Sequence, residues 1–181
     1  MGATGAGRGR RCTMGGAVAG AALLASLAWS AAAATEPLPA PQGAPILAVS
    51  GNLAAVRQGG TAALDLAFLR TLPQADLTTE TPWTDGAVHF EGVWMRDLLA
   101  RLGAKGETVV AAGTDEYRIE IPLADFQDYD VLLAYAQNGQ LLRPEDKGPL
   151  WIVYPFSADP ELKKDIYFAR CVWQLTGLTV R

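Results

Sequence analysis

Cys171, near the C-terminal end, is the only cysteine in the last 169 residues of the chain. The segment YFARCVWQL, residues 167–175, places Cys171 between Arg170 and Trp173. A cysteine could be a metal ligand or a nucleophile, in both cases as the thiolate, or a small packed side chain. The only other cysteine is Cys12. If Cys12 leaves with an export signal, Cys171 has no disulfide partner, and an unpaired thiol in an oxidising compartment is tolerated when buried. The sequence therefore favours a packed Cys171.

Several common catalytic sites lack the residues that they need. The one histidine, His89, has no second histidine or nearby cysteine with which to bind zinc. No Gly-x-Ser-x-Gly motif accompanies it, and the chain has no glycine-rich loop of the two common phosphate-binding types. The acidic residues are dispersed and form no evident acid/base pair. A lone histidine of this kind is more often a surface or core residue than a catalytic one.

Large flat side chains near polar residues are the remaining chemical feature. Trp83 lies in the polar segment TETPWTDG, Tyr117 follows Asp115 and Glu116, and Trp173 follows Arg170. Aromatic faces hold planar heterocycles while a few polar groups fix their orientation. The alternative is that such residues, with Trp94, are core aromatics, because tryptophan is heavily buried on average. Trp83 is the exception, since its neighbours are polar or turn-forming.

Strands outnumber helices in the pattern of alternating and periodic apolar residues. Strands are predicted at residues 45–51, 87–93, 107–113, 116–122, 131–142 (a hairpin at Asn138–Gly139), 148–155 and 170–180. Helical segments are predicted at residues 62–70 (capped by Thr61), 94–104 (with Trp94, Leu98 and Leu102 on one face and a stop at Gly103), 123–129 and, as a loop or short helix, 159–168. This arrangement predicts an α+β domain built on mixed sheet.

The N-terminal residues 1–34 have the pattern of a secretory signal peptide. A cationic start precedes an uncharged apolar run and a small-residue tract, SAAAAT. The pair Arg10–Arg11 leaves twin-arginine export as an alternative to an ordinary cationic start. Residues 35–44 are a Pro-rich tether, and residues 45–181 have the length of one domain. Loss of three arginines with the signal changes the formal charge from −4 to −7, and an acidic domain without a basic cluster is not expected to bind nucleic acid.

The mature chain resembles the molybdopterin-binding domain of the sulfite oxidase superfamily, in its small periplasmic form. The segments that carry the resemblance are, in the family's order, FEGVWMRDLLARLGA, AAGTDEYRIEIPLADF, LLAYAQNGQLLRPEDKGPLWIVYP and YFARCVWQL. The resemblance implies a single mixed α+β domain that binds a pterin across loops at one end of the sheet. In the catalytic members a cysteine thiolate holds molybdenum in the region matching residues 75–83. This chain has no cysteine between Thr13 and Arg170.

Without that thiolate, the chain is more similar to the small periplasmic proteins that bind a pterin without metal. The resemblance implies that the protein signals the bound pterin to a membrane-bound sensor with a periplasmic domain, such as a cyclic-di-GMP cyclase/phosphodiesterase or a kinase. A pterin has a guanine-like edge whose N–H groups can donate hydrogen bonds to a carboxylate. It also has a carbonyl oxygen that can bind a cationic side chain. The residues thereby expected to contact the ligand are Trp83, Trp94, Asp115, Glu116, Tyr117, Lys147, Arg170, Cys171 and Trp173.

Three hypotheses follow from the sequence. The first is a periplasmic pterin receptor without catalysis or metal. The second is a molybdopterin-dependent oxidoreductase, or an accessory subunit of one, whose metal is held without a cysteine or through Cys171. The third is an interaction protein whose pocket has decayed.

Overall fold

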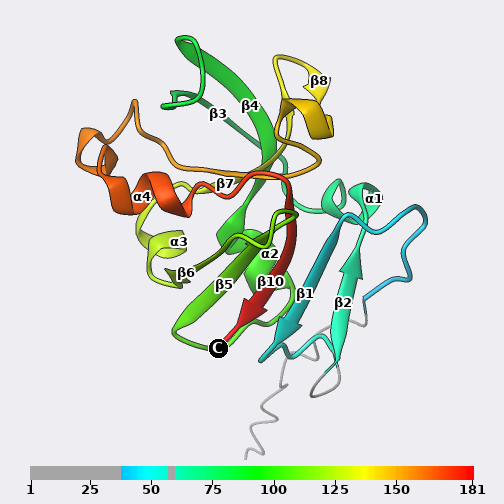
Figure 1. Cartoon of the computed structure of the whole chain (residues 1–181). Helices are drawn as coiled ribbons and strands as arrows, with labels where there is room; N and C mark the ends of the chain where they lie inside the picture. Colours follow the sequence, from blue (N-terminus) through cyan, green and yellow to red (C-terminus); the bar gives the residue numbers. More distant parts are fainter. Residues whose placement is uncertain (1–37, 57–59) are drawn as a thin grey trace, which may run out of the picture. The chain divides into compact units, whose positions relative to one another are not determined.

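Two β-sheets form the framework that carries the loops of the domain (Figure 1). The computed structural model describes residues 38–56 and 60–181. The predicted signal peptide and the first residues of the predicted tether lie outside this part. No helix within the described residues is long and apolar enough to cross a membrane.

The first sheet has the strand order β2-β1-β10-β5-β6. Its strands are β1 (Leu47–Gly51), β2 (Thr61–Leu64), β5 (Thr108–Gly113), β6 (Arg118–Pro122) and β10 (Leu175–Val180). β1 and β10 are parallel, while the other neighbours are antiparallel, so the sheet is mixed. Burial alternates along β5, as expected for a strand with one face on the core.

The second sheet is antiparallel and has β4 and β7 at its centre. Its strands are β3 (Ala75–Glu80), β4 (Ala87–Trp94), β7 (Leu132–Gln137), β8 (Gln140–Leu141) and β9 (Trp151–Val153). Asn138 and Gly139 join β7 to β8 with φ values of 48° and 78°, the two-residue turn that their sequence predicted. The α+β class with mixed sheet is confirmed.

The helices of the described residues are short. They are α1 (Leu66–Leu69), α2 (Met95–Arg101), α3 (Asp125–Asp128) and α4 (Asp165–Arg170), with 3-10 turns η1 (Pro144–Asp146) and η2 (Pro160–Leu162). A larger apolar core includes Val109, Leu178 and Phe126, and a smaller one gathers around Phe90 and Trp151. The loops at one end of the sheets lie over these cores.

Three predictions about local structure were wrong. Thr61 begins β2 and caps no helix, because residues 61–64 pair with β1; Asp65 caps α1 instead, accepting from Phe68 N at 2.8 Å. Trp94 ends β4, and its ring packs on the smaller core, away from the buried face of α2. Arg170 ends α4 and does not begin the last strand, which starts at Leu175.

Part of the predicted tether is bound to the domain. The backbone N–H groups of Gln42 and Gly43 donate to Oδ2 of Asp65 at 2.6 and 2.7 Å. The Asp65 carboxylate therefore joins the approach to β1 to the start of α1.

Candidate functional site

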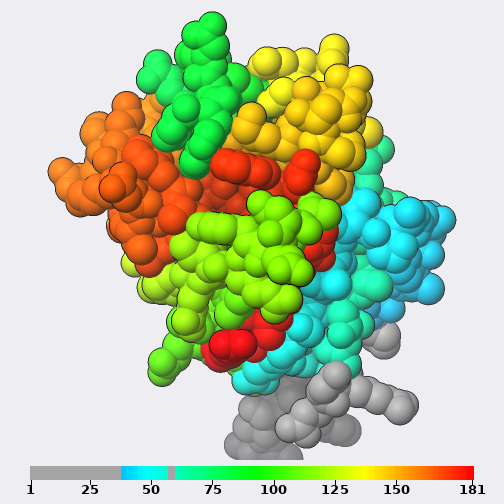
Figure 2. Space-filling view, viewed as in Figure 1, coloured from blue at the N-terminus to red at the C-terminus, as the bar shows by residue number. Residues whose placement is uncertain are grey.

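A pocket of about 200 Å³ lies where three loop segments meet, and it is partly open to solvent. The segments are the β3–β4 connection (residues 81–86), the β5–β6 turn (114–117) and the chain from the end of α4 to the approach to β10 (168–173). In Figure 2 they are green, yellow-green and orange-red, and they gather on the face turned to the viewer. The pocket is smaller than the roughly 300–1,000 Å³ of sites for drug-sized ligands, so it suits a single small ring system.

Five of the nine residues predicted from the sequence line this pocket. They are Trp83, Asp115, Tyr117, Cys171 and Trp173. Three further residues complete the lining: Phe168, Ala169 and Val172.

Threonine hydroxyls hold the turn that presents Trp83. Thr81 N donates to Thr84 Oγ1 at 3.0 Å, and Trp83 N donates to Thr81 Oγ1 at 3.2 Å. Gly86, with φ of 75°, then returns the chain to β4. Such side-chain bonds to the backbone are why threonine and glycine favour turns. They fix an apolar ring within a polar segment.

The indole of Trp83 is the central ring of an aromatic wall. Its centroid lies 5.0 Å from that of Trp173 at an interplanar angle of 74°, and 6.3 Å from those of Phe168 and Trp151. These are edge-to-face contacts, which aromatic rings prefer to face-to-face sandwiches. Two indoles at a steep angle give a flat ligand one face to stack on and one edge to lie against.

The β5–β6 turn supplies the polar side of the pocket. Glu116 adopts φ of 65°, and Tyr117 N donates to Asp115 Oδ1 at 3.2 Å, which holds the carboxylate at the turn. Tyr117 Oη donates to the carbonyl of Ala169 at 2.9 Å, joining the turn to α4. Partial burial, with Asp115 and Cys171 nearby, raises the pKa of Tyr117, so its hydroxyl remains a donor at neutral pH.

Cys171 lies in the inner wall of the pocket, with 3% of its surface exposed. Burial raises the pKa of its thiol to about 12, although its surroundings include a backbone hydrogen bond involving Tyr154 that opposes the shift. The group is therefore a neutral thiol at physiological pH, whereas a metal ligand or nucleophile needs the thiolate. This placement agrees with the packed interpretation.

Arg170 was expected to contact the ligand, but it does not line the pocket. Its Nη1 donates to Oδ2 of Asp125 in α3 at 2.7 Å, and Tyr154 Oη donates to the same oxygen at 2.7 Å. The guanidinium also lies 5.3 Å from the ring centroid of Tyr167. Asp125 is buried, and a buried carboxylate needs a cation or donors around it. The tertiary structure therefore assigns Arg170 to a buried ion pair.

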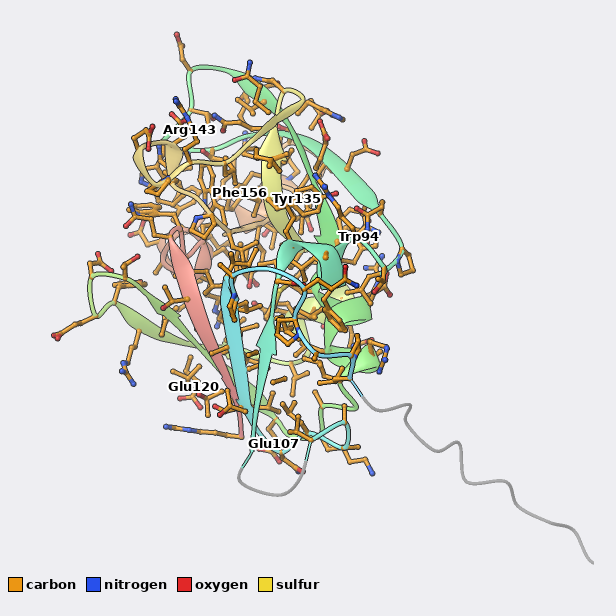
Figure 3. All side chains as sticks on the ribbon, turned by 90° about the vertical axis from the view of Figure 1, so that its right-hand side faces the viewer. Trp94, Glu107, Glu120, Tyr135, Arg143 and Phe156 are labelled. Atoms are coloured by element: carbon orange, nitrogen blue, oxygen red, sulfur yellow. The ribbon has the colours of Figure 1, made fainter. Side chains whose placement is uncertain are left out.

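The remaining predicted residues lie outside the pocket lining. Trp94 is at the far end of β4 from Trp83, near α2, with the Arg96 guanidinium 5.2 Å from its ring (Figure 3). Glu116 is exposed in its turn. Lys147 places Nζ 5.4 Å from the ring centroid of Trp151.

The sequence prediction missed Phe168, Ala169 and Val172. Phe168 and Cys171 are three positions apart, the spacing that places side chains on one side of a helix turn. Extending the predicted helix to Arg170 would have placed Phe168 beside Cys171. Because a strand was predicted from Arg170 onward, this helical spacing was not recognised.

The lining fits a flat, mainly apolar heterocycle with polar groups on one edge. Rings can stack at Trp83 and Trp173, and Asp115 can accept paired N–H groups, since a carboxylate has about four acceptor positions. The same residues do not supply a thiolate for molybdenum. Within the described part of the chain, no group of three or more His, Cys, Asp or Glu side chains is placed to hold a metal ion.

The fold and the lining of the pocket define an α+β domain with a small aromatic pocket, and comparison with known proteins identifies its family. The profile of the oxidoreductase molybdopterin binding domain family matches residues 67–161, just over half of the 181-residue chain. The chain belongs to this family. The match includes the segments of Trp83 and Asp115 but ends before α4.

One curated relative is the "Uncharacterized oxidoreductase YuiH" of Bacillus subtilis (strain 168). It is 34% identical over 91 residues, which are 49% of this chain and 46% of the relative. The chain thus aligns with slightly less than half the length of that relative.

Proposed function

We propose that this protein is a pterin receptor of the periplasm, which binds a metal-free pterin and relays its presence to a membrane-bound signalling partner without catalysis. The observation that carries the proposal is the composition of the pocket. Two indoles and one carboxylate surround it, while the only cysteine after residue 12 is a buried neutral thiol in its wall. These groups support binding of a flat ring and supply no thiolate for an oxo-transfer metal.

The surface around the pocket supports a relay. Tyr117 and Ile166, with exposures of 41% and 50%, are two of the most exposed large hydrophobic residues in the described chain. Tyr117 lines the pocket, and Ile166 lies on α4, whose C-terminal residues line it as well. A partner that contacts these side chains would touch the segments that line the pocket.

The proposed periplasmic location and the proposed membrane-bound partner rest on the sequence. The signal-peptide pattern of residues 1–34 supports export, and the resemblance to small periplasmic pterin-binding proteins supports a membrane-bound sensor, either a cyclic-di-GMP cyclase/phosphodiesterase or a kinase.

A molybdopterin-dependent oxidoreductase, or an accessory subunit of one, is the second candidate function. The name of the Bacillus relative, an oxidoreductase, favours it. Such an enzyme would have to hold its metal without a cysteine or displace the proton of Cys171. Binding a metal at that sulfur would require removing it from the apolar wall in which it packs.

Metal content and ligand fluorescence of the protein purified from periplasm test these alternatives together. A fluorescent pterin at one equivalent, without molybdenum, is the expected result. Stoichiometric molybdenum would support the oxidoreductase instead. Absence of both, with no binding of added pterin, would favour an interaction protein with a decayed pocket. Trp83→Ala should lower the amount of pterin that co-purifies, whereas the matched variant Trp94→Ala should retain the wild-type amount.

A further inference from the structure

We infer that the pocket selects its ligand by charge: it takes pterins whose substituents are uncharged and discriminates against those with a carboxylate or phosphate. The inference rests on the proposed function and names the ligand class of the same site. It separates this chain from a receptor for molybdopterin itself, which carries a phosphate.

The charge of the pocket lining is negative. Asp115 is its single acidic side chain, and the other lining residues among those described are aromatic, aliphatic or a thiol. Glu116 follows in the same turn and is exposed. An anionic ligand would therefore meet one carboxylate and no cation in the described lining.

Three basic residues are neighbours of lining residues in sequence or were predicted to contact the ligand, and none of them lines the pocket. Arg170 is next to Cys171 in sequence, but its guanidinium binds the buried Asp125 at 2.7 Å. Lys147 lies over the ring of Trp151, 5.4 Å from its centroid. Arg118, beside Tyr117, begins β6 and does not line the pocket. Each cation that the sequence places near the ligand is thus outside the lining.

A second pocket of about 210 Å³ adjoins the first and shares Phe168 with it. Its lining contains one lysine, Lys163, and one glutamate, Glu80, together with Thr81, Pro82 and Phe156. The second pocket thus has one charge of each sign in its lining. These opposed charges suit a short polar, uncharged substituent better than a phosphate.

Coulomb's law gives the size of the expected discrimination. If Asp115 binds the guanine-like edge, a charge on the opposite end of the ring lies about 8 Å away. With an effective dielectric constant between roughly 20 and 80, the repulsion changes Kd by about 2- to 35-fold. Salt should reduce the difference, because exposed charges are screened within about 10 Å at 0.1 M ionic strength.

The test compares two ligands of nearly equal size, 6-hydroxymethylpterin and pterin-6-carboxylate. Both are titrated into the exported full-length protein, freed of ligand, at low and high salt, with ligand fluorescence as the signal. We expect the hydroxymethyl compound to bind at least about 2-fold more tightly at low salt, with a smaller ratio at high salt. Asp115→Asn should weaken the binding of both ligands and bring the ratio of their Kd values toward one.

Glu107→Gln is the matched control for charge removal. Glu107 is exposed at the other end of β5 from the turn of Asp115 (Figure 3), so its loss should leave the ratio unchanged. Equal or tighter binding of pterin-6-carboxylate by the wild type would overturn the charge selection while leaving a pterin receptor. A ratio that does not respond to Asp115→Asn would also overturn it. Binding of neither compound would overturn the proposed function, and the inference with it.

Discussion

Arg170 and Asp125 form a largely buried ion pair, with Nη1 and Oδ2 2.7 Å apart and side-chain exposures of 13% and 10%. The pair joins the end of α4 to α3, and Tyr154 donates to the same carboxylate oxygen. Since Arg170 precedes Cys171 directly, the pair also fixes the start of the segment that forms one pocket wall.

Removal of Asp125 should therefore destabilise the domain strongly. Asp125→Ala leaves the Arg170 charge buried without its partner, and such losses cost about 3–5 kcal/mol. The control Tyr154→Phe removes one neutral donor to the same carboxylate and should cost about 1 kcal/mol. Urea unfolding measures both free energies. If Asp125→Ala and Tyr154→Phe lost equally little unfolding free energy, Arg170 would be stabilised by groups other than Asp125.

Asp65 should make stability fall at acidic pH. Hydrogen bonds from Phe68, Gly43 and Gln42 N–H groups lower its pKa below the ordinary 3.8. A carboxyl with a lowered folded-state pKa contributes stability above its unfolded pKa and loses it as the pH falls through the folded value. The urea midpoint should thus fall from pH 5 to pH 2.5, and less so in Asp65→Asn. An equal fall of the urea midpoint in Asp65→Asn and the wild type would contradict the assignment of this pH dependence to Asp65.

Substitution of Cys171 should have little effect on ligand binding. Cys171→Ala removes a small packed group and should cost of order 1 kcal/mol in unfolding free energy, with pterin affinity within a few-fold of the wild type. Because burial raises its pKa to about 12, the thiol should react with a disulfide reagent slowly in the folded state and rapidly in urea. Rapid labelling of the folded protein would show an exposed thiolate.

The indoles of the pocket should contribute affinity through stacking. Trp83→Ala and Trp173→Ala should each weaken pterin binding by about 1–3 kcal/mol, by analogy with base–aromatic stacking. The effect should be similar for different pterins, because stacking depends on the shared ring. Trp94→Ala, which removes an indole outside the pocket lining, should leave the titrated affinity unchanged. An equal loss in Trp94→Ala would indicate a general effect on folding.

Ile166 should be needed for the signalling partner and not for the ligand. Ile166→Asp places a charge on an exposed apolar position of α4 and should abolish recovery of a membrane sensor from periplasm and membranes. Leu141→Asp is the matched control, since Leu141 is 49% exposed on β8. Pterin titration should be the same in both variants. Sensor recovery by Ile166→Asp at the wild-type level would remove α4 from the interface.

Local sequence alone determined several parts of the fold. The Asn138–Gly139 hairpin, β5 and α2 followed from turn chemistry and apolar periodicity, which act over a few residues. That Cys171 is the only cysteine after residue 12 likewise followed from the sequence by counting. Trp83 was singled out because its neighbours are polar, and it lines the pocket.

Only the tertiary structure decided which side chains meet in the pocket. Trp83, Asp115 and Cys171 come from separate turns, and their meeting depends on the pairing of β4, β5 and β10 with distant strands. The same long-range packing directed Arg170 to Asp125, 45 residues away, and left the lining with a single carboxylate. Sequence patterns report the conformational preferences of neighbouring residues. The partner of a buried charge depends on which distant groups packing brings within hydrogen-bond distance.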